Sequence, residues 1–227
     1  MDDYLSESEK WEAIKVWLRE NTLWILAGVL VGGAAIGGWR WYQDHVDTQA
    51  LTAGGKYQSV IASLANGDAT AASVLLGAME RDDAASPYLD QAKLAVARFY
   101  VESGDLPKAV TQLQSVVDHA RDKELAVVAR LRLARVQIAQ NKPDDALTTL
   151  NAIPQGAFPA LVHDVRGDAY HAKGDKPSAL KEYQLARTAD LAGVTDTQLL
   201  DLKITDLLAD AGTTSKPTQP PAAAAAK

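Results

Sequence analysis

The sequence contains no cysteine, and this absence removes several kinds of chemistry at once. Without cysteine the chain has no disulfides, no thiol nucleophile and no thiolate ligands for a metal, and its redox compartment stays open. A basic surface is missing as well, because 23 Lys and Arg face 29 Asp and Glu and give a formal net charge of −6. Nucleic-acid binding depends on such a surface, so we expect no nucleic-acid partner.

Catalytic and metal-binding motifs are also missing. His163 and His171 lie eight residues apart with Gly167 midway, which excludes a helix-spaced pair of histidine ligands. Asp164, Asp168 and His171 share a helix face, a pattern that is usual for solvated side chains. No nucleophile elbow or paired-carboxylate motif stands out. We predict no enzyme, no catalytic, metal-binding or cofactor-binding residue and no cofactor; the alternative is an unrecognised site around His163, Asp168 and His171.

What the sequence does contain is one long uncharged run. Positions 21–39 carry no charge, and at about 1.5 Å per residue they cover the roughly 30 Å hydrocarbon core of a bilayer. The run is apolar or small on every side, unlike an amphipathic helix of a soluble domain. It ends in an aromatic group typical of a membrane interface, formed by Trp39, Arg40, Trp41 and Tyr42. We predict a transmembrane helix over residues 21–42.

The residues before this run argue for a permanent anchor. They are rich in Asp and Glu, whereas a cleaved signal peptide begins with basic residues. Cleavage after the small residues Ala35 and Gly37 is the alternative. The basic residues near the two ends favour an N-terminus in the cytoplasm, with Lys10, Lys15 and Arg19 before the run and Arg40 and Lys56 after it. Residues 1–20 are then a cytoplasmic amphipathic segment, and the C-terminal part is periplasmic in a bacterial cell.

Internal repetition is the strongest signal after the anchor. Segments that begin at Leu89, Ala126 and Pro159 share a small residue, then a turn, then a second small residue, then a large one. In that order the matching positions are Ala97, Ala134 and Gly167; Gly104, Asn141 and Gly174; Ala109, Ala146 and Ala179; and Leu113, Leu150 and Tyr183. The pattern resembles tetratricopeptide repeats, which recur about every 34 residues. A weaker fourth copy begins near Ala53 and places its turn at Gly67.

The repeat pattern has a physical explanation in the packing of helix pairs. Two antiparallel helices approach closely where both carry small side chains, and the large residue fills the neighbouring groove. Gly or Asn suits the left-handed residue that ends a helix, and Pro107, Pro143 and Pro177 suit the first turn of the next. We predict an all-α protein in which a single N-terminal transmembrane helix precedes an α-solenoid of degenerate tetratricopeptide repeats. The alternative is an ordinary helical domain whose self-similarity is accidental.

Domain boundaries follow from these assignments. The repeat domain is predicted over residues 43–211, with a terminal amphipathic helix from Thr195 capping its open end. Residues 212–227 form a tail rich in Pro and Ala that cannot bury a core, so we expect it to be disordered.

The first helix of each repeat is expected to line a concave groove. Its candidate binding residues are Tyr57, Leu94, Arg98, Leu131, Arg135 and Asp168. Apolar side chains with two arginines and a carboxylate suit an extended or partly folded polypeptide. The alternative is that Arg98 and Arg135 pair with acids of the next repeat. The lysines and asparagines that grip a terminal carboxylate in chaperone-binding repeats are not evident, which speaks against capture of C-terminal peptides.

Glycines inside the predicted span suggest contact with another helix. Gly28 with Gly32, and Gly33 with Gly37, form two small-xxx-small pairs that permit close backbone approach. Such pairs favour packing on a partner helix or on a second copy of this one. The alternative is the general abundance of glycine in membrane spans.

Four stretches together resemble the YfgM family of bacterial inner-membrane proteins. They are "WEAIKVWLREN", "GGWRWY", "LRLARVQIAQNKPDDALTTL" and "DVRGDAYHAKGD". The resemblance implies a non-enzymatic, membrane-anchored adaptor, an ancillary subunit of the SecYEG translocon with its repeat domain in the periplasm. It further implies association with PpiD, a membrane-anchored periplasmic prolyl isomerase, and transfer of exported polypeptides to periplasmic chaperones. A cytoplasmic role in stress signalling is a further implication.

A second function class stays open at this stage. A soluble or tethered periplasmic repeat scaffold for envelope or pilus assembly would have the same repeats. Cleavage after the glycine run would distinguish the soluble form, because its mature N-terminus would follow that run.

Overall fold

The computed structural model describes residues 7–190, 193 and 195–214. The predictions for residues 1–6 and for the tail beyond residue 214 lie outside this range. The described elements are all helices: α1 (Glu7–Ala65), α2 (Ala69–Asp82), α3 (Pro87–Glu102), α4 (Leu106–His119), α5 (Lys123–Ala139), α6 (Pro143–Asn151), α7 (Pro159–Ala172), α8 (Lys176–Ala189) and α9 (Thr197–Thr214). The predicted all-α class is confirmed. The chain divides into two compact units, Met1–Gly54 and Gly55–Lys227.

The first unit consists of the greater part of α1. This helix contains an apolar stretch long enough to cross a membrane, and none of that stretch is buried within the protein. Trp24, for example, is 77% exposed. Large apolar side chains left in contact with water are unfavourable, so an apolar surrounding such as the bilayer core suits them. The predicted span, residues 21–42, lies within Ile14–Ala65, the part of α1 in which this stretch is found.

α1 is longer than the sequence predicted. We expected an amphipathic segment, a span and a separate repeat helix, whereas one helix runs from Glu7 to Ala65. No proline interrupts these residues. Each glycine in α1 weakens the helix by only about 1 kcal/mol, and none of them ends it.

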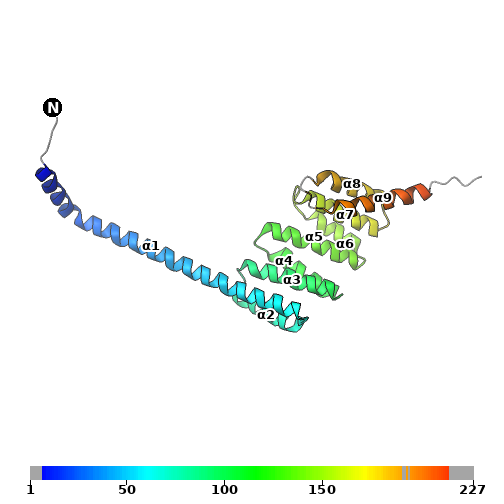
Figure 1. The fold of residues 1–227 in the computed structure, drawn as a ribbon, viewed down its shortest axis with the longest axis horizontal. Helices are drawn as coiled ribbons and strands as arrows, with labels where there is room; N and C mark the ends of the chain where they lie inside the picture. The colour runs from blue at the N-terminus through cyan, green and yellow to red at the C-terminus, as the bar shows by residue number, and fades with distance from the viewer. Residues whose placement is uncertain (1–6, 191–192, 194, 215–227) are drawn as a thin grey trace, which may run out of the picture. The chain divides into compact units, whose positions relative to one another are not determined.

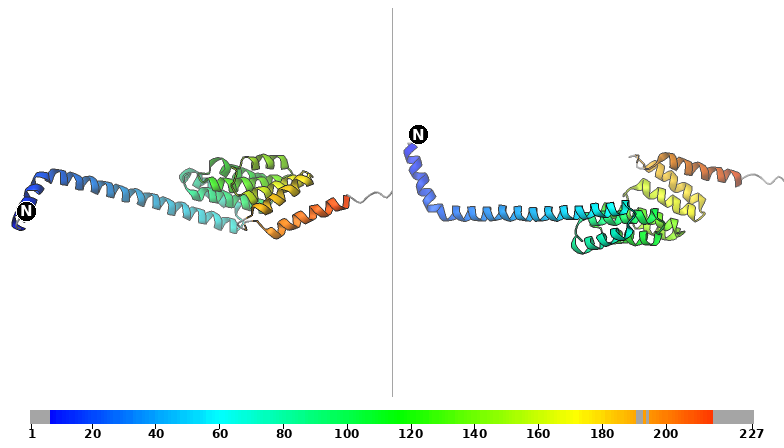
Figure 2. Two further views of the ribbon diagram at one scale, coloured as in Figure 1. Left: turned by 90° about the horizontal axis from the view of Figure 1, so that it is seen from above. Right: turned by 60° about the horizontal axis from the view of Figure 1, so that its bottom comes forward.

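The second unit is a stack of helical hairpins. Along the chain, α3 packs on α4, α4 on α5, α5 on α6, α6 on α7 and α7 on α8. Figure 1 shows α3 to α8 as successive hairpins, which overlap when they are seen from above in the left view of Figure 2. α9 packs on α8 and so covers the last hairpin of the stack. This architecture confirms the predicted solenoid of tetratricopeptide-like repeats.

The turns between paired helices have the backbone geometry that the sequence predicted. Gly67, Gly104, Asn141 and Gly174 all have positive φ, between 60° and 80°. This left-handed conformation ends a helix and reverses the chain at little strain for Gly or Asn. Proline then stands in the first turn of the following helix in α4, α6 and α8.

Small residues bring the helices of each pair together. Ala97 and Ala134 are buried, as are Ala109, Ala146 and Ala179 on the facing helices. In the third pair a Cβ added to Gly167 would lie 2.4 Å from Cε1 of Tyr183, so the ring occupies the space that a side chain would take. In this repeat, therefore, the large residue Tyr183 packs directly against the small residue Gly167.

The core of the stack is built in series. One cluster of buried side chains joins α1 to α5, a second joins α5 to α7, and a third joins α8 to α9. Each layer therefore draws its stability from its neighbours, as in other repeat proteins.

Two features of the second unit differ from the predicted pattern. α6 ends at Asn151, and a loop leads to Phe158, which has φ 46° and is 37% exposed. A non-glycine residue with positive φ is uncommon, and no turn motif in the sequence predicted this one. At the other end α9 continues to Thr214, past residue 211.

Candidate functional site: a protein-binding groove

The predicted groove residues differ in how much of each side chain reaches the surface. Leu94 and Leu131 are both buried, on α3 and α5, and belong to the apolar clusters. Tyr57, near the end of α1, stacks at a tilt on Tyr88 of α3 with 5.9 Å between ring centroids. Because Leu131 packs in the core, the accessible part of the groove is made by other side chains.

The two predicted arginines have different partners. Nε of Arg98 donates to Oε1 of Glu102 at 2.7 Å, one turn away on the same helix. Nη2 of Arg135 lies 3.5 Å from Oδ2 of Asp164, which belongs to α7 of the next repeat. The alternative of pairing between repeats therefore holds for Arg135 and is wrong for Arg98. Both arginine side chains are exposed, and exposed ion pairs of this kind hold a side chain only weakly.

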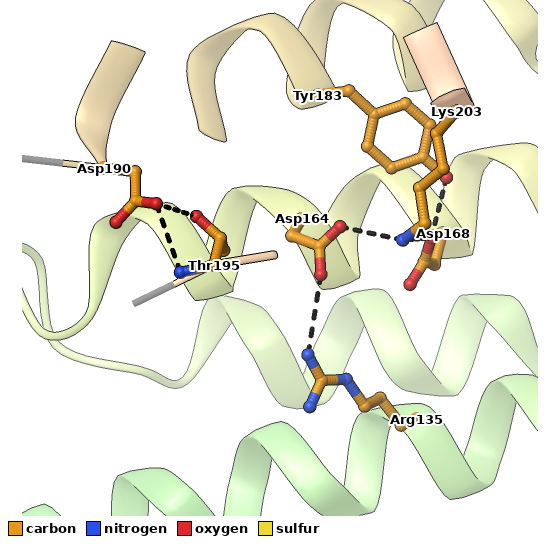
Figure 3. Close-up of polar contacts among 7 residues, drawn as sticks. All are labelled: Arg135, Asp164, Asp168, Tyr183, Asp190, Thr195 and Lys203. Carbon is orange, nitrogen blue, oxygen red and sulfur yellow. Dashed lines mark hydrogen bonds and ion pairs between the residues drawn. The ribbon is translucent and has the colours of Figure 1, made fainter. Parts of the chain in front are cut away.

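The predicted carboxylate of Asp168 is engaged within the chain (Figure 3). Nζ of Lys203 on α9 donates to Oδ1 of Asp164 at 2.8 Å and to Oδ1 of Asp168 at 2.6 Å. The hydroxyl of Tyr183 donates to the same oxygen of Asp168 at 2.7 Å, and Nζ of Lys203 lies 5.1 Å from the centroid of that ring. These contacts tie α9 to α7 and α8, so Asp168 has a structural role.

Electrostatics in this cluster favour the observed protonation states. Burial lowers the pKa of Lys203, but hydrogen bonds to Asp164 and Asp168 outweigh burial and leave the pKa above its usual 10.5. Burial and then the hydrogen bond to Asp168 raise the pKa of Tyr183 far above its usual range. A charged lysine and a neutral tyrosine are therefore the stable forms over the physiological pH range.

Asp190 and Thr195, at the two ends of the connection from α8 to α9, are joined by hydrogen bonds (Figure 3). The backbone N–H of Thr195 donates to Oδ2 of Asp190 at 3.2 Å, and the Thr195 hydroxyl donates to the same oxygen. Asp196 then accepts from the backbone N–H groups of Gln198 and Leu199 at 3.1 Å and caps α9. These bonds fix where α9 begins.

An open pocket lies between the first helices of two neighbouring repeats, α3 and α5. Its volume is about 310 Å³. Apolar side chains and three arginines line it: Leu94, Ala97, Val101, Leu113 and Val136, with Arg98, Arg132 and Arg135. Sequence reasoning missed Arg132 and Val101. Helical spacing could have found them, because they stand three residues from Arg135 and Arg98 and so share their helix faces.

His163, Asp168 and His171 do not come together in one polar site. Nδ1 of His163 lies 2.7 Å from Oε2 of Glu182 on α8, and His171 is exposed. Asp168 instead contacts Tyr183 and Lys203. Within residues 7–190, 193 and 195–214, no group of three or more His, Asp or Glu is placed to hold a metal ion.

Together these features define a helical-repeat protein with an apolar stretch in α1 that is not buried and an open pocket between α3 and α5. The sequence model of the tetratricopeptide repeat-like domain matches residues 15–209. A protein of Escherichia coli (strain K12) named "Ancillary SecYEG translocon subunit" is 32% identical over 91% of this chain and 99% of its own length. Proteins of that name from Aggregatibacter actinomycetemcomitans and Haemophilus influenzae are 28% and 27% identical, each over 89% of this chain and 98% of their own lengths. The chain belongs to this family, the YfgM family that the motifs indicated.

Proposed function

We propose that this protein is a non-catalytic adaptor of the SecYEG translocon, anchored in the bacterial inner membrane by α1. The observation that carries the proposal is the contrast between the unburied apolar stretch of α1 and a repeat stack with its own core. Family membership supports the assignment to the translocon, because the relatives carry that role in their name. Repeat stacks of this kind bind polypeptides on extended surfaces, which suits an adaptor.

The proposed topology places the N-terminus in the cytoplasm and the repeat stack in the periplasm. The basic residues before the apolar stretch support this orientation. The natural absence of cysteine permits a clean test. In Arg81→Cys, at an exposed position of α2, the thiol should react with a membrane-impermeant maleimide in intact spheroplasts, whereas Glu12→Cys should react only after lysis. The reverse pattern would refute the orientation.

Within the membrane, the two glycine pairs are proposed to contact helices of the partner complex. A Cβ added at Gly28, Gly32, Gly33 or Gly37 would meet no described atom from elsewhere in the chain within 4 Å. At 3.6 residues per turn, the pair Gly28 and Gly32 and the pair Gly33 and Gly37 lie on different sides of α1, so each forms its own smooth ridge. At the end of the span, Trp39, Arg40, Trp41 and Tyr42 are proposed to lie at the membrane interface.

Outside the membrane, the groove is proposed to hold exported polypeptides or a partner domain. Proximity to the translocon would bring emerging chains to the repeat stack and link them to periplasmic chaperones. The membrane-anchored prolyl isomerase PpiD is the proposed neighbour in this transfer. Arg98, Arg135 and Val101 are exposed and accessible for such contacts, whereas Asp168 is held by Lys203.

The experiment that tests the proposal is purification of the tagged full-length protein from mildly solubilised membranes, followed by mass spectrometry. We expect translocon subunits and PpiD to be recovered with it. Leucine at both Gly28 and Gly32 should reduce that recovery, while leucine at both Ala27 and Ala34, two exposed positions on the side of α1 away from both glycine pairs, should leave it unchanged. Absence of translocon subunits from the wild-type preparation would reject the adaptor role.

A further inference from the structure

The pocket between α3 and α5 combines an apolar floor with a positively charged rim. Leu94, Ala97, Leu113 and Val136 are buried and expose only their edges to the pocket. Val101, at the mouth, is 41% exposed. The pocket is open to the outside between α3 and α5, and Ala97 is one of the small side chains that line it. A volume of about 310 Å³ lies within the range of small ligand pockets.

The rim of this pocket has one sign of charge. Its three charged residues are Arg98, Arg132 and Arg135, and no acidic side chain stands among the residues that line it. This contrasts with the chain as a whole, whose net charge is −6. A positive rim in an acidic protein attracts negative groups and repels basic ones, and so contributes to the choice of partner.

The three guanidinium groups differ in how firmly they are held. Arg98 pairs with Glu102 along its own helix, and both side chains are mostly exposed. Arg135 reaches Asp164 at 3.5 Å, but that carboxylate is already bonded to Lys203 at 2.8 Å. Arg132 is exposed and has no ion pair among the described residues. Incoming carboxylates can therefore bind Arg132 directly and exchange with weak contacts at the other two arginines.

From this arrangement we infer that the α3–α5 pocket selects polypeptide segments in which a bulky apolar side chain is flanked by Asp or Glu. The apolar side chain enters between Ala97 and Val136, and the flanking carboxylates bind Arg132 and Arg98. This inference rests on the proposed polypeptide-binding function and specifies the class of segment that the groove takes. Basic segments are excluded by the same three arginines, because like charges at an interface are repelled.

The test uses the full-length chain in lipid nanodiscs and a random-peptide library displayed on phage. We expect enrichment of sequences with a large apolar residue beside Asp or Glu. One enriched peptide is then synthesised with a fluorescent label, and its binding is measured by anisotropy. Its affinity should fall about tenfold or more in Arg132→Glu and should weaken as salt is raised, because salt screens the contacts with the arginines.

Two matched controls separate the pocket from general charge and hydrophobicity. Arg81→Glu makes the same change of charge on α2 as Arg132→Glu makes on α5, and it should leave the peptide affinity unchanged. Val101→Asp should abolish binding by placing a carboxylate at the mouth, whereas Val74→Asp at an exposed position of α2 should not. Circular dichroism of each variant shows whether the repeat stack remains folded.

Several outcomes would overturn the inference. They are enrichment of basic or neutral sequences, no enrichment at all, or binding that survives Arg132→Glu. Displacement of the peptide by soluble short-chain phosphatidylglycerol would assign the arginines to a lipid headgroup instead. Failure of the adaptor role can be distinguished from failure of this inference. In that case translocon subunits would be absent from the wild-type purification, while the wild type would still bind the acidic peptide.

Discussion

Glycines in α1 and in α7 stand in opposite surroundings. A Cβ added to Gly28 or Gly32 would meet no described atom from elsewhere in the chain within 4 Å, whereas at Gly167 it would lie 2.4 Å from the Tyr183 ring. In the repeat stack, residue 167 is a glycine because the Tyr183 ring occupies the space that a side chain would take. In the apolar stretch of α1 the chain itself supplies no neighbour, so any requirement for a small residue there comes from outside the chain.

Replacement of Gly167 with alanine should have the largest effect on the repeat stack. The added methyl group must displace the buried Tyr183 ring and disturb its hydrogen bond to Asp168. Overpacking and loss of that bond outweigh the gain in helix propensity, and we expect a loss of roughly 2–3 kcal/mol in the free energy of unfolding. Urea denaturation followed by circular dichroism measures it.

Gly77→Ala is the matched control for this change. Gly77 lies inside α2, where an added Cβ would come no closer than 3.9 Å to an exposed arginine side chain. We expect no loss, or a gain of up to about 1 kcal/mol from helix propensity. Equal destabilisation by the two substitutions would show that the Tyr183 contact is not what requires glycine.

Removal of the positive charge of Lys203 on α9 should have an intermediate effect on the stability of the repeat stack. Lys203→Met leaves Asp164 and Asp168 without their hydrogen-bonded cation in a partly buried cluster. We expect a loss of about 1–2 kcal/mol, and faster amide hydrogen exchange in α9 than in α3 or α5. Lys181→Met, at an exposed position of α8, is the control. Unchanged exchange in α9 would mean that apolar packing alone holds the helix.

High pH should weaken the same cluster. Lys203 has a raised pKa in the folded protein, so its contribution to stability is fully present below its unfolded value near 10.5 and is lost as the pH rises further. Tyr183 acts in the same direction, because the folded protein keeps its proton at a pH where the unfolded chain releases it. The stability gap between wild type and Lys203→Met should stay constant from neutral pH to about pH 10 and narrow above it. A gap that narrows below pH 9 would contradict this assignment.

Substitution of the anchor glycines should have the smallest effect on the repeat stack. Alanine at both Gly28 and Gly32 meets no neighbour in the chain, so we expect the thermal unfolding of the stack to be unchanged. Circular dichroism melting of the full-length protein in detergent checks this result. A lowered melting temperature would indicate that these glycines already pack within the protein, contrary to the comparison drawn above.

Local chain chemistry explains why the repeats could be predicted from the sequence. Gly104, Asn141 and Gly174 end helices in the left-handed conformation, and few other residues do so readily. The buried positions Ala109, Ala146 and Ala179 follow at fixed spacing after these turns. Such features depend on neighbours within one hairpin, so the pattern in the sequence carries them.

The groove was harder to predict because it depends on contacts between distant residues. Lys203 lies far along the chain from Asp168, and nothing in the spacing of either indicates that they meet. The same holds for Arg135 and Asp164, whose pairing depends on the packing of α5 against α7. Helical spacing alone could indicate Arg132 but could not show that a pocket lies beside it.

The serial arrangement of the three apolar clusters limits how far damage can spread. α9 belongs to the last cluster, whereas the pocket between α3 and α5 draws its floor from the first. Loosening of α9 by alkali or by the loss of Lys203 therefore leaves the walls of that pocket with their own supports. If force is applied to the C-terminal end of such a stack, its layers should unfold one at a time. The pocket between α3 and α5 should then still hold a bound segment after the first layers have unfolded.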